Sequence, residues 1–107
     1  MKTDTRLEQV GLSLAGSPAL PDVILLDAKA RRLWLIEVVA TGGEITEARR
    51  AALLKWAAQR GVEADGCSFL TVYRSRSTPV ARRTIGRLAW GTDVWFADEP
   101  DHIMRLE

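Results

Sequence analysis

Two apolar runs joined by a short polar segment constrain the fold of this chain more than any other feature. PDVILLD at 21–27 and RLWLIEVVA at 32–40 have the length and the apolar, β-branched content of strands that are covered on both faces. The polar segment DAKARR connects them and is short enough for antiparallel pairing. We therefore predict a hairpin at the start of a sheet.

Helix and strand signals alternate after this hairpin. A helix is predicted from about Glu47 to Arg60, with Thr46 as N-cap and Gly61 just past its end. The segment CSFLTVY has the composition of a third strand. The predicted order to this point is strand, strand, helix and strand.

A second helix and a last strand are predicted in the C-terminal third. Thr78-Pro79 opens a helix, because proline is pre-shaped for the first helical position. This helix is predicted to end near Gly91. Residues 93–97 form a short strand, and residues 3–10 carry the signal of a short helix. The whole order describes an α/β domain over 1–107, with a mixed sheet flanked by helices in three layers.

Size and composition limit the class of protein. A length of 107 residues allows one domain with a single core. No apolar run approaches the roughly 20 residues that span a bilayer, and the N-terminus lacks a signal-peptide pattern. One cysteine, Cys67, excludes an internal disulfide, and with one histidine, His102, it argues against structural zinc. We expect a cytoplasmic protein with no membrane segment.

The charges are unevenly distributed. Residues 45–92 carry nine basic and three acidic side chains, whereas residues 93–107 carry one basic and five acidic ones. Twelve of the fifteen basic residues are Arg, whose planar group suits bidentate contacts with phosphate and guanine. A high-GC genome, which enriches Arg everywhere, is the alternative source of this bias. The middle of the chain is therefore a candidate polyanion-binding region.

A carboxylate stands in the middle of the second apolar run. Glu37 should meet a cation there, because removing the hydration of an ionised Glu costs several kcal/mol. Asp22 would fall at the same open end of the hairpin, and two converging acids repel unless a divalent ion neutralises them. Two interpretations stay open: a Mg²⁺ site, or a Glu37–Arg salt bridge with Asp22 capping a turn.

The chain resembles a known nuclease family. PD followed by a hairpin and an apolar strand with Glu resembles the PD-(D/E)xK nuclease core. The stretches PDVILLD, WLIEVVATGG and AWGTDVWFADEPDH look more specifically like the BsuBI/PstI family of type II restriction endonucleases. The resemblance implies a restriction-endonuclease-like fold and Mg²⁺-dependent cleavage of double-stranded DNA at CTGCAG, with Mn²⁺ able to substitute. It also implies a homodimer that acts on palindromic sites.

The resemblance also assigns site residues. Asp22 and Glu37 would be the acidic metal ligands, and the main-chain carbonyl of Val38 a further ligand. The Lys of the standard motif falls at Val39, so another residue must supply the positive charge. Arg49 is the candidate, because it belongs to the sheet-facing side of the predicted helix near its N-terminal end. Its role would be electrostatic, since Arg stays protonated; Arg50 is the runner-up.

A structural ion pair of Arg49 with Glu37 or Glu44 is the alternative to its catalytic role.

Other features of the chain depart from the family. Family members are much longer, with an N-terminal DNA-binding portion, and the loop TGGE lacks the family's His. Glu8 is a further acidic candidate from a preceding helix. A non-catalytic DNA-binding or oligomerising remnant, or a structure-selective repair-type nuclease, is therefore an alternative to a restriction enzyme.

Several arginines are candidates for gripping the DNA backbone. The candidates on or after predicted helices and strands are Arg50, Arg74, Arg76, Arg83 and Arg87. Arg83 and Arg87 are spaced i, i+4 and would share one face of the second helix. Such contacts give salt-dependent affinity without sequence information. A solvated helix face is the alternative explanation for the last two.

Overall fold

The computed structural model describes residues 20–40 and 43–107, and within them a five-stranded sheet and two α-helices. The predicted helix at 3–10, Glu8 and part of the TGGE loop lie outside the described residues. The elements in chain order are β1 (Val23–Asp27), β2 (Arg32–Val39), α2 (Glu47–Ala58), the 3₁₀ turn η1 (Ala64–Gly66), β3 (Cys67–Tyr73), α3 (Pro79–Thr84), the 3₁₀ turn η2 (Ile85–Arg87), β4 (Asp93–Phe96) and β5 (Ile103–Arg105).

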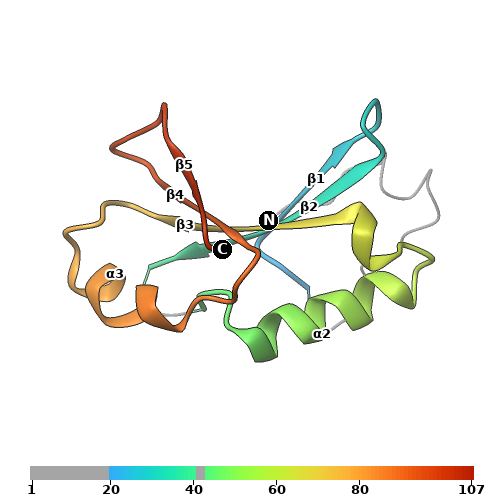
Figure 1. The fold of residues 1–107 in the computed structure, drawn as a ribbon, viewed down its shortest axis with the longest axis horizontal. Helices are drawn as coiled ribbons and strands as arrows, with labels where there is room; N and C mark the ends of the chain where they lie inside the picture. The colour runs from blue at the N-terminus through green and yellow to red at the C-terminus, as the bar shows by residue number, and fades with distance from the viewer. Residues whose placement is uncertain (1–19, 41–42) are drawn as a thin grey trace.

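The sheet is mixed and its strands follow the chain order. β1 pairs antiparallel with β2, which confirms the predicted hairpin; β2, β3 and β4 are parallel, and β5 returns antiparallel to β4. Figure 1 shows this order from the blue hairpin at β1 to the red one at β5. The sequence did not predict β5, because three residues after a polar turn are too few for a period-2 pattern. The mixed α/β fold class is confirmed.

Local signals explain where the helices begin. Thr46 and Thr78 both accept a hydrogen bond from the backbone N–H three residues later, which satisfies a donor that the first helical turn leaves unpaired. Pro79 occupies the first turn of α3. α2 ends two residues earlier than predicted, a difference that is usual at a fraying helix end.

The second predicted helix is wrong in its length. α3 ends at Thr84 and continues only as the 3₁₀ turn η2, so no α-helix reaches Gly91. The Thr84 hydroxyl donates to the Val80 carbonyl, a local bond that competes with helix continuation. Arg87 lies in η2, and the predicted shared α-helical face of Arg83 and Arg87 is therefore also wrong.

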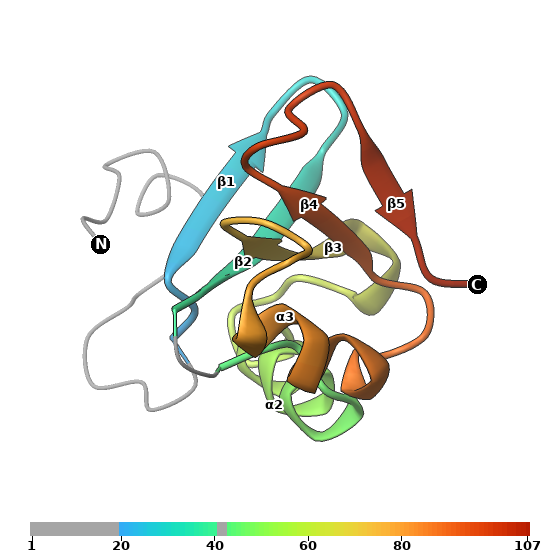
Figure 2. The same cartoon turned by 90° about the vertical axis from the view of Figure 1, so that its left-hand side faces the viewer.

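Both helices pack on one face of the sheet. Alternate residues of the strands, such as Leu35 and Phe69, form a core with Leu53 and Trp56 of α2. A second core joins the far end of β2 to β4 and α3. Figures 1 and 2 show α2 and α3 on the same side, so the described residues form two layers where the sequence analysis predicted three. Within the described residues, no helix has the length and apolarity needed to cross a bilayer.

Candidate active site

The open end of the β1–β2 hairpin brings the two predicted carboxylates together. Val23 pairs with Ile36, so Asp22, one residue earlier, stands beside Glu37. The backbone N–H of Val38 donates to Asp22 Oδ2 at 3.0 Å, which fixes this carboxylate against β2. Asp22 is exposed, whereas Glu37 is buried with 4% of its surface accessible. One acid of the pair therefore faces solvent and the other lies within the protein.

Glu37 meets the arginine that the sequence analysis selected. Arg49 Nε donates to Glu37 Oε1 at 2.8 Å, and Arg49 Nη2 lies 2.6 Å from the same oxygen. Nη2 also donates to the Leu20 carbonyl at 3.2 Å. Arg49 reaches this position because Glu37 points to the helix-covered face of the sheet and α2 begins shortly after β2. The predicted proximity of Arg49 to Glu37 is present, and Glu44 is not its partner.

Opposing effects act on the Glu37 carboxyl. Burial raises its pKa, the Arg49 hydrogen bond and charge lower it, and the neighbouring Asp22 raises it again. The net direction is upward, so Arg49 does not fully offset burial and the second acid. A partly buried pair of acids with an incomplete counter-charge is an arrangement that an additional cation would stabilise.

The donor set fits a magnesium ion. Asp22 and Glu37 would supply two hard oxygen ligands, and the main chain at Val38 lies beside both. Mg²⁺ is usually held by one or two carboxylates, with waters and substrate phosphate completing its shell. The described ranges contain no group of three or more Asp, Glu, His or Cys side chains that could hold a metal ion, so the protein would provide only part of that shell.

Val39 occupies the position of the motif lysine, and its side chain is part of the core. It is 4% exposed and packs with Tyr73 and Val94 on the helix-covered face. A charged amine is therefore absent at this position. Arg49 approaches Glu37 from the same side of the sheet and is the cation nearest to the carboxylate pair among the described residues.

Arg50, Arg76 and Arg87, among the predicted DNA-binding arginines, form ion pairs within the protein. Arg50 pairs with Glu47 and lies over the Phe69 ring, so it does not reach the carboxylates. Arg76 makes a two-point contact with Glu99, at 2.6 and 2.8 Å. The third, Arg87, lies 3.0 Å from the buried Glu44. A phosphate that binds any of these arginines would have to share the guanidinium with its carboxylate partner.

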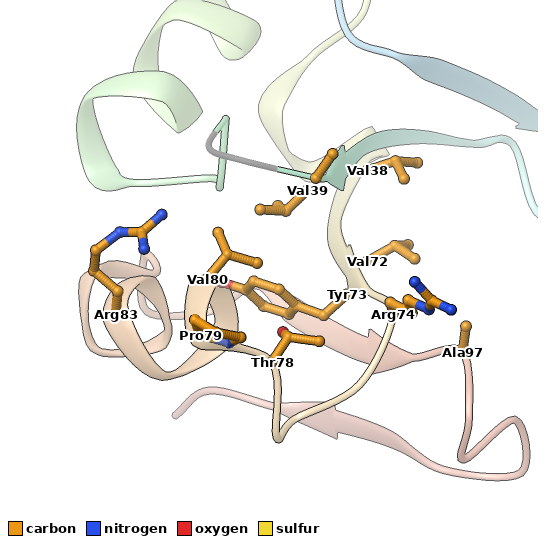
Figure 3. A pocket seen from close by; sticks show the side chains of 11 residues that line it. Val38, Val39, Val72, Tyr73, Arg74, Thr78, Pro79, Val80, Arg83 and Ala97 are labelled. Atoms are coloured by element: carbon orange, nitrogen blue, oxygen red, sulfur yellow. The ribbon is translucent and has the colours of Figure 1, made fainter.

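The other two arginines border a groove beside the carboxylates. This groove, about 700 Å³ in volume, is lined by the last residues of β2 and β3 and the first turn of α3. Arg74 and Arg83 stand on opposite sides of its apolar lining (Figure 3). Val38, one residue after Glu37, is part of the lining. Neither Asp22 nor Glu37 lines the groove, so Val38 is the residue that connects it to the candidate metal site.

Sequence reasoning missed this groove. The floor of the groove, its apolar lining, consists largely of valines and a proline. These residue types are also typical of ordinary strands and helix starts. One signal was available: ligands in open α/β sheets bind outside the carboxyl ends of parallel strands, and β2, β3 and β4 all end here. The parallel order of the strands, which depends on tertiary pairing, was needed to apply that rule.

Known proteins resemble this chain over nearly its whole length. A family model described as the BsuBI/PstI restriction endonuclease domain matches residues 1–107. Type II restriction enzyme BsuBI from Bacillus subtilis is 31% identical over 100 residues, which cover 94% of this chain and 30% of BsuBI.

A solved structure shows the same fold. The structure of SdaI restriction endonuclease aligns with a TM-score of 0.77 and 30% identity, covering 94% of this chain and 30% of SdaI. This chain therefore spans about 30% of the length of the relatives that it matches. The alignment confirms a restriction-endonuclease-like fold.

Proposed function

The chain belongs to the BsuBI/PstI restriction endonuclease family, and from this membership we propose that it is a Mg²⁺-dependent endonuclease domain acting on double-stranded DNA. The observation that carries the proposal is the convergence of Asp22 and Glu37 at the open end of the hairpin, with Arg49 on the buried acid. The proposed reaction is attack of water on a phosphodiester, leaving 5′-phosphate and 3′-hydroxyl ends. A homodimer acting on both strands is the proposed assembly.

Three groups would hold the metal. The Asp22 and Glu37 carboxylates and the Val38 carbonyl are the proposed ligands, and Mn²⁺ would substitute because it accepts the same oxygen donors. When bound, the ion would neutralise charge on the phosphate and lower the pKa of a bound water. The Val38 N–H keeps Asp22 in place by its hydrogen bond, so one residue would serve the site through both of its main-chain groups.

Arg49 would provide the fixed positive charge that the lysine of the motif usually supplies. Its guanidinium is held by Glu37 Oε1 and the Leu20 carbonyl, so its position is set before substrate arrives. Pre-positioned charge stabilises a developing anion more than mobile charge does. Arg49 stays protonated, so it would not act as a general base.

Plasmid cleavage tests this proposal. Purified protein is incubated with supercoiled plasmid in Mg²⁺, in Mn²⁺ and in EDTA, next to the variants Asp22→Ala and Asp27→Ala. Asp27 is the matched control, because it is an exposed acid at the other end of β1. We expect cleavage by the wild type and Asp27→Ala with either metal, and none by Asp22→Ala. Equal nicking by Asp22→Ala contradicts the site assignment.

A non-catalytic DNA-binding domain is the second candidate. The observation that favours it is the buried Val39 at the lysine position, together with the engagement of Arg49 in an ion pair. DNA retention that weakens with salt, ignores metal and is never followed by cleavage would select this function over the first. Branched substrates tested beside plain duplex would identify a structure-selective nuclease.

A further inference from the structure

The groove beside the carboxylates has few free hydrogen-bonding groups. Its side chains are mostly apolar, and they include Val72, Pro79 and Val80. The Tyr73 hydroxyl is fully buried and bonded to Thr84 Oγ1 at 2.7 Å. The Thr78 hydroxyl donates to the Ser75 carbonyl and caps α3. A nucleobase edge would therefore find hardly any partner on these side chains.

Charge is concentrated on the two sides of the groove. Arg74 and Arg83 are exposed lining residues, and none of the eleven lining residues is acidic. Among the described residues, the Arg74 guanidinium has no carboxylate partner. Phosphates placed on either side would thus meet a cation, while the unit between them would lie on an apolar surface.

Val38 connects the carboxylates to this groove, so a bound DNA strand would continue from one to the other. Val38 belongs both to the candidate metal site and to the groove lining. A phosphate held at Asp22 and Glu37 is followed along the strand by a sugar and another phosphate. The alternation of apolar sugar and anionic phosphate matches the apolar floor and the arginine borders.

We propose that the groove holds the sugar–phosphate unit adjoining the cleaved phosphate, with deoxyribose on the floor around Val72 and phosphate on Arg74 or Arg83, and so distinguishes DNA from RNA. A ribose 2′-hydroxyl would be pressed against valine and proline without a partner, which costs free energy. The inference rests on the proposed nuclease function. It goes further by assigning sugar selectivity to named residues outside the metal site.

Binding of two single strands that differ only in the sugar tests the proposal. Fluorescence anisotropy measures the Kd of the protein for (dU)20 and (rU)20, with Ca²⁺ replacing Mg²⁺ as a hard cation that takes the same oxygen ligands. Single strands avoid the difference between A-form and B-form duplexes. We expect the wild type to prefer (dU)20 by about tenfold, the factor that one unpaired buried hydroxyl produces.

Matched variants separate the groove from the rest of the protein. Val72→Thr adds a hydroxyl partner to the floor without changing the shape of the strand, and it should reduce the preference to below about threefold. Val62→Thr, a half-buried valine outside the groove, should keep it. Arg74→Ala should weaken both strands about equally, and Arg82→Ala, an exposed arginine of α3 outside the lining, should do so less.

Each outcome decides the proposal separately from the nuclease function. Equal affinity of the wild type for both strands, or no measurable binding of either, overturns it, as does an unchanged preference in Val72→Thr. A deoxyribose preference that Val72→Thr removes supports it even if plasmid is never cleaved. Plasmid cleavage without any sugar preference supports the proposed function and overturns the groove assignment.

Discussion

Two acids in this sheet are similarly buried, and each has an arginine partner. Glu37 in β2 and Asp93 in β4 are 4% and 6% exposed, and burial raises the pKa of both. Each pairs with one arginine, Arg49 or Arg105, which also donates to a main-chain carbonyl. Burial and an arginine partner are therefore not sufficient to mark an active site.

The difference between the two acids lies in their neighbours. Glu37 has Asp22 beside it and the groove one residue further along β2. Asp93 lies at the start of β4 on the face away from the helices, and the like charge that raises its pKa is that of Glu107. A second carboxylate held by the sheet distinguishes a candidate metal site from a structural ion pair, and Asp93 serves as an internal control.

Replacing each acid with its isosteric amide should give the largest difference in cleavage rate between the two sites. Glu37→Gln should lower Mg²⁺-dependent cleavage on the order of 10³-fold, because it removes a metal ligand while keeping the shape of the side chain. Asp93→Asn should leave the rate within about threefold. Cleavage rates on plasmid are measured, with circular dichroism showing that both variants are folded. A comparable loss of cleavage in both would erase the distinction between the acids.

Replacing the arginine partners, Arg49 and Arg105, should give the second-largest difference in cleavage rate. Arg49→Met should lower the cleavage rate about 10²-fold, the usual loss when a fixed charge at a reacting centre is removed. Arg49→Lys should recover part of it, since it keeps the charge but not the two-point geometry. Arg105→Met should change stability only. The measurement is cleavage under single-turnover conditions, and a normal rate for Arg49→Met would make this ion pair structural like that of Asp93.

The sequence predicted one of these acids and not the other, for a physical reason. Glu37 stands inside an eight-residue apolar strand, so its burial follows from the pattern alone. Asp93 opens a four-residue strand, where an acid reads as a turn residue. Its burial depends on the pairing of β4 with β5, which the sequence analysis did not predict.

Features of the fold and the site that depend on local sequence are predictable, and those that depend on distant contacts are not. The hairpin, β3 and the start of each helix came from local patterns and caps. Arg49 was located because helical spacing put it on the sheet-facing side of α2. The end of α3 at Thr84, the groove and the ion pair of Arg76 with Glu99 depend on contacts between distant segments. Local patterns do not encode such contacts, and this limit explains the missed features.

Metal binding should stabilise the fold through one acid pair only. At a Mg²⁺ concentration about ten times its Kd, the free energy of unfolding should rise by about 1.4 kcal/mol, a shift in Tm of roughly 5–10 °C. Asp22→Asn should abolish the shift, and Asp93→Asn should keep it. Differential scanning fluorimetry with and without Mg²⁺ gives the measurement. An equal shift in Asp22→Asn would place the ion elsewhere.

The smallest expected effect is on the pKa of Glu37, and it tests the influence of Asp22 directly. Asp22 raises the pKa of Glu37, so Asp22→Asn should lower the pKa of Glu37, while the pKa of Asp93 should stay as in the wild type. The sign carries over to stability: the folded state binds the Glu37 proton more tightly than the unfolded chain, so the free energy of unfolding falls as pH rises through the interval between the two pKa values. Removing Asp22 should shorten that interval and reduce the fall. Carboxyl ¹³C shifts followed from pH 3 to 8 report both acids in one experiment, and urea midpoints over the same range report stability. If the pKa of Glu37 stayed unchanged or rose in Asp22→Asn, the two carboxylates would not be coupled. Glu37 would then be a structural ion-pair residue like Asp93.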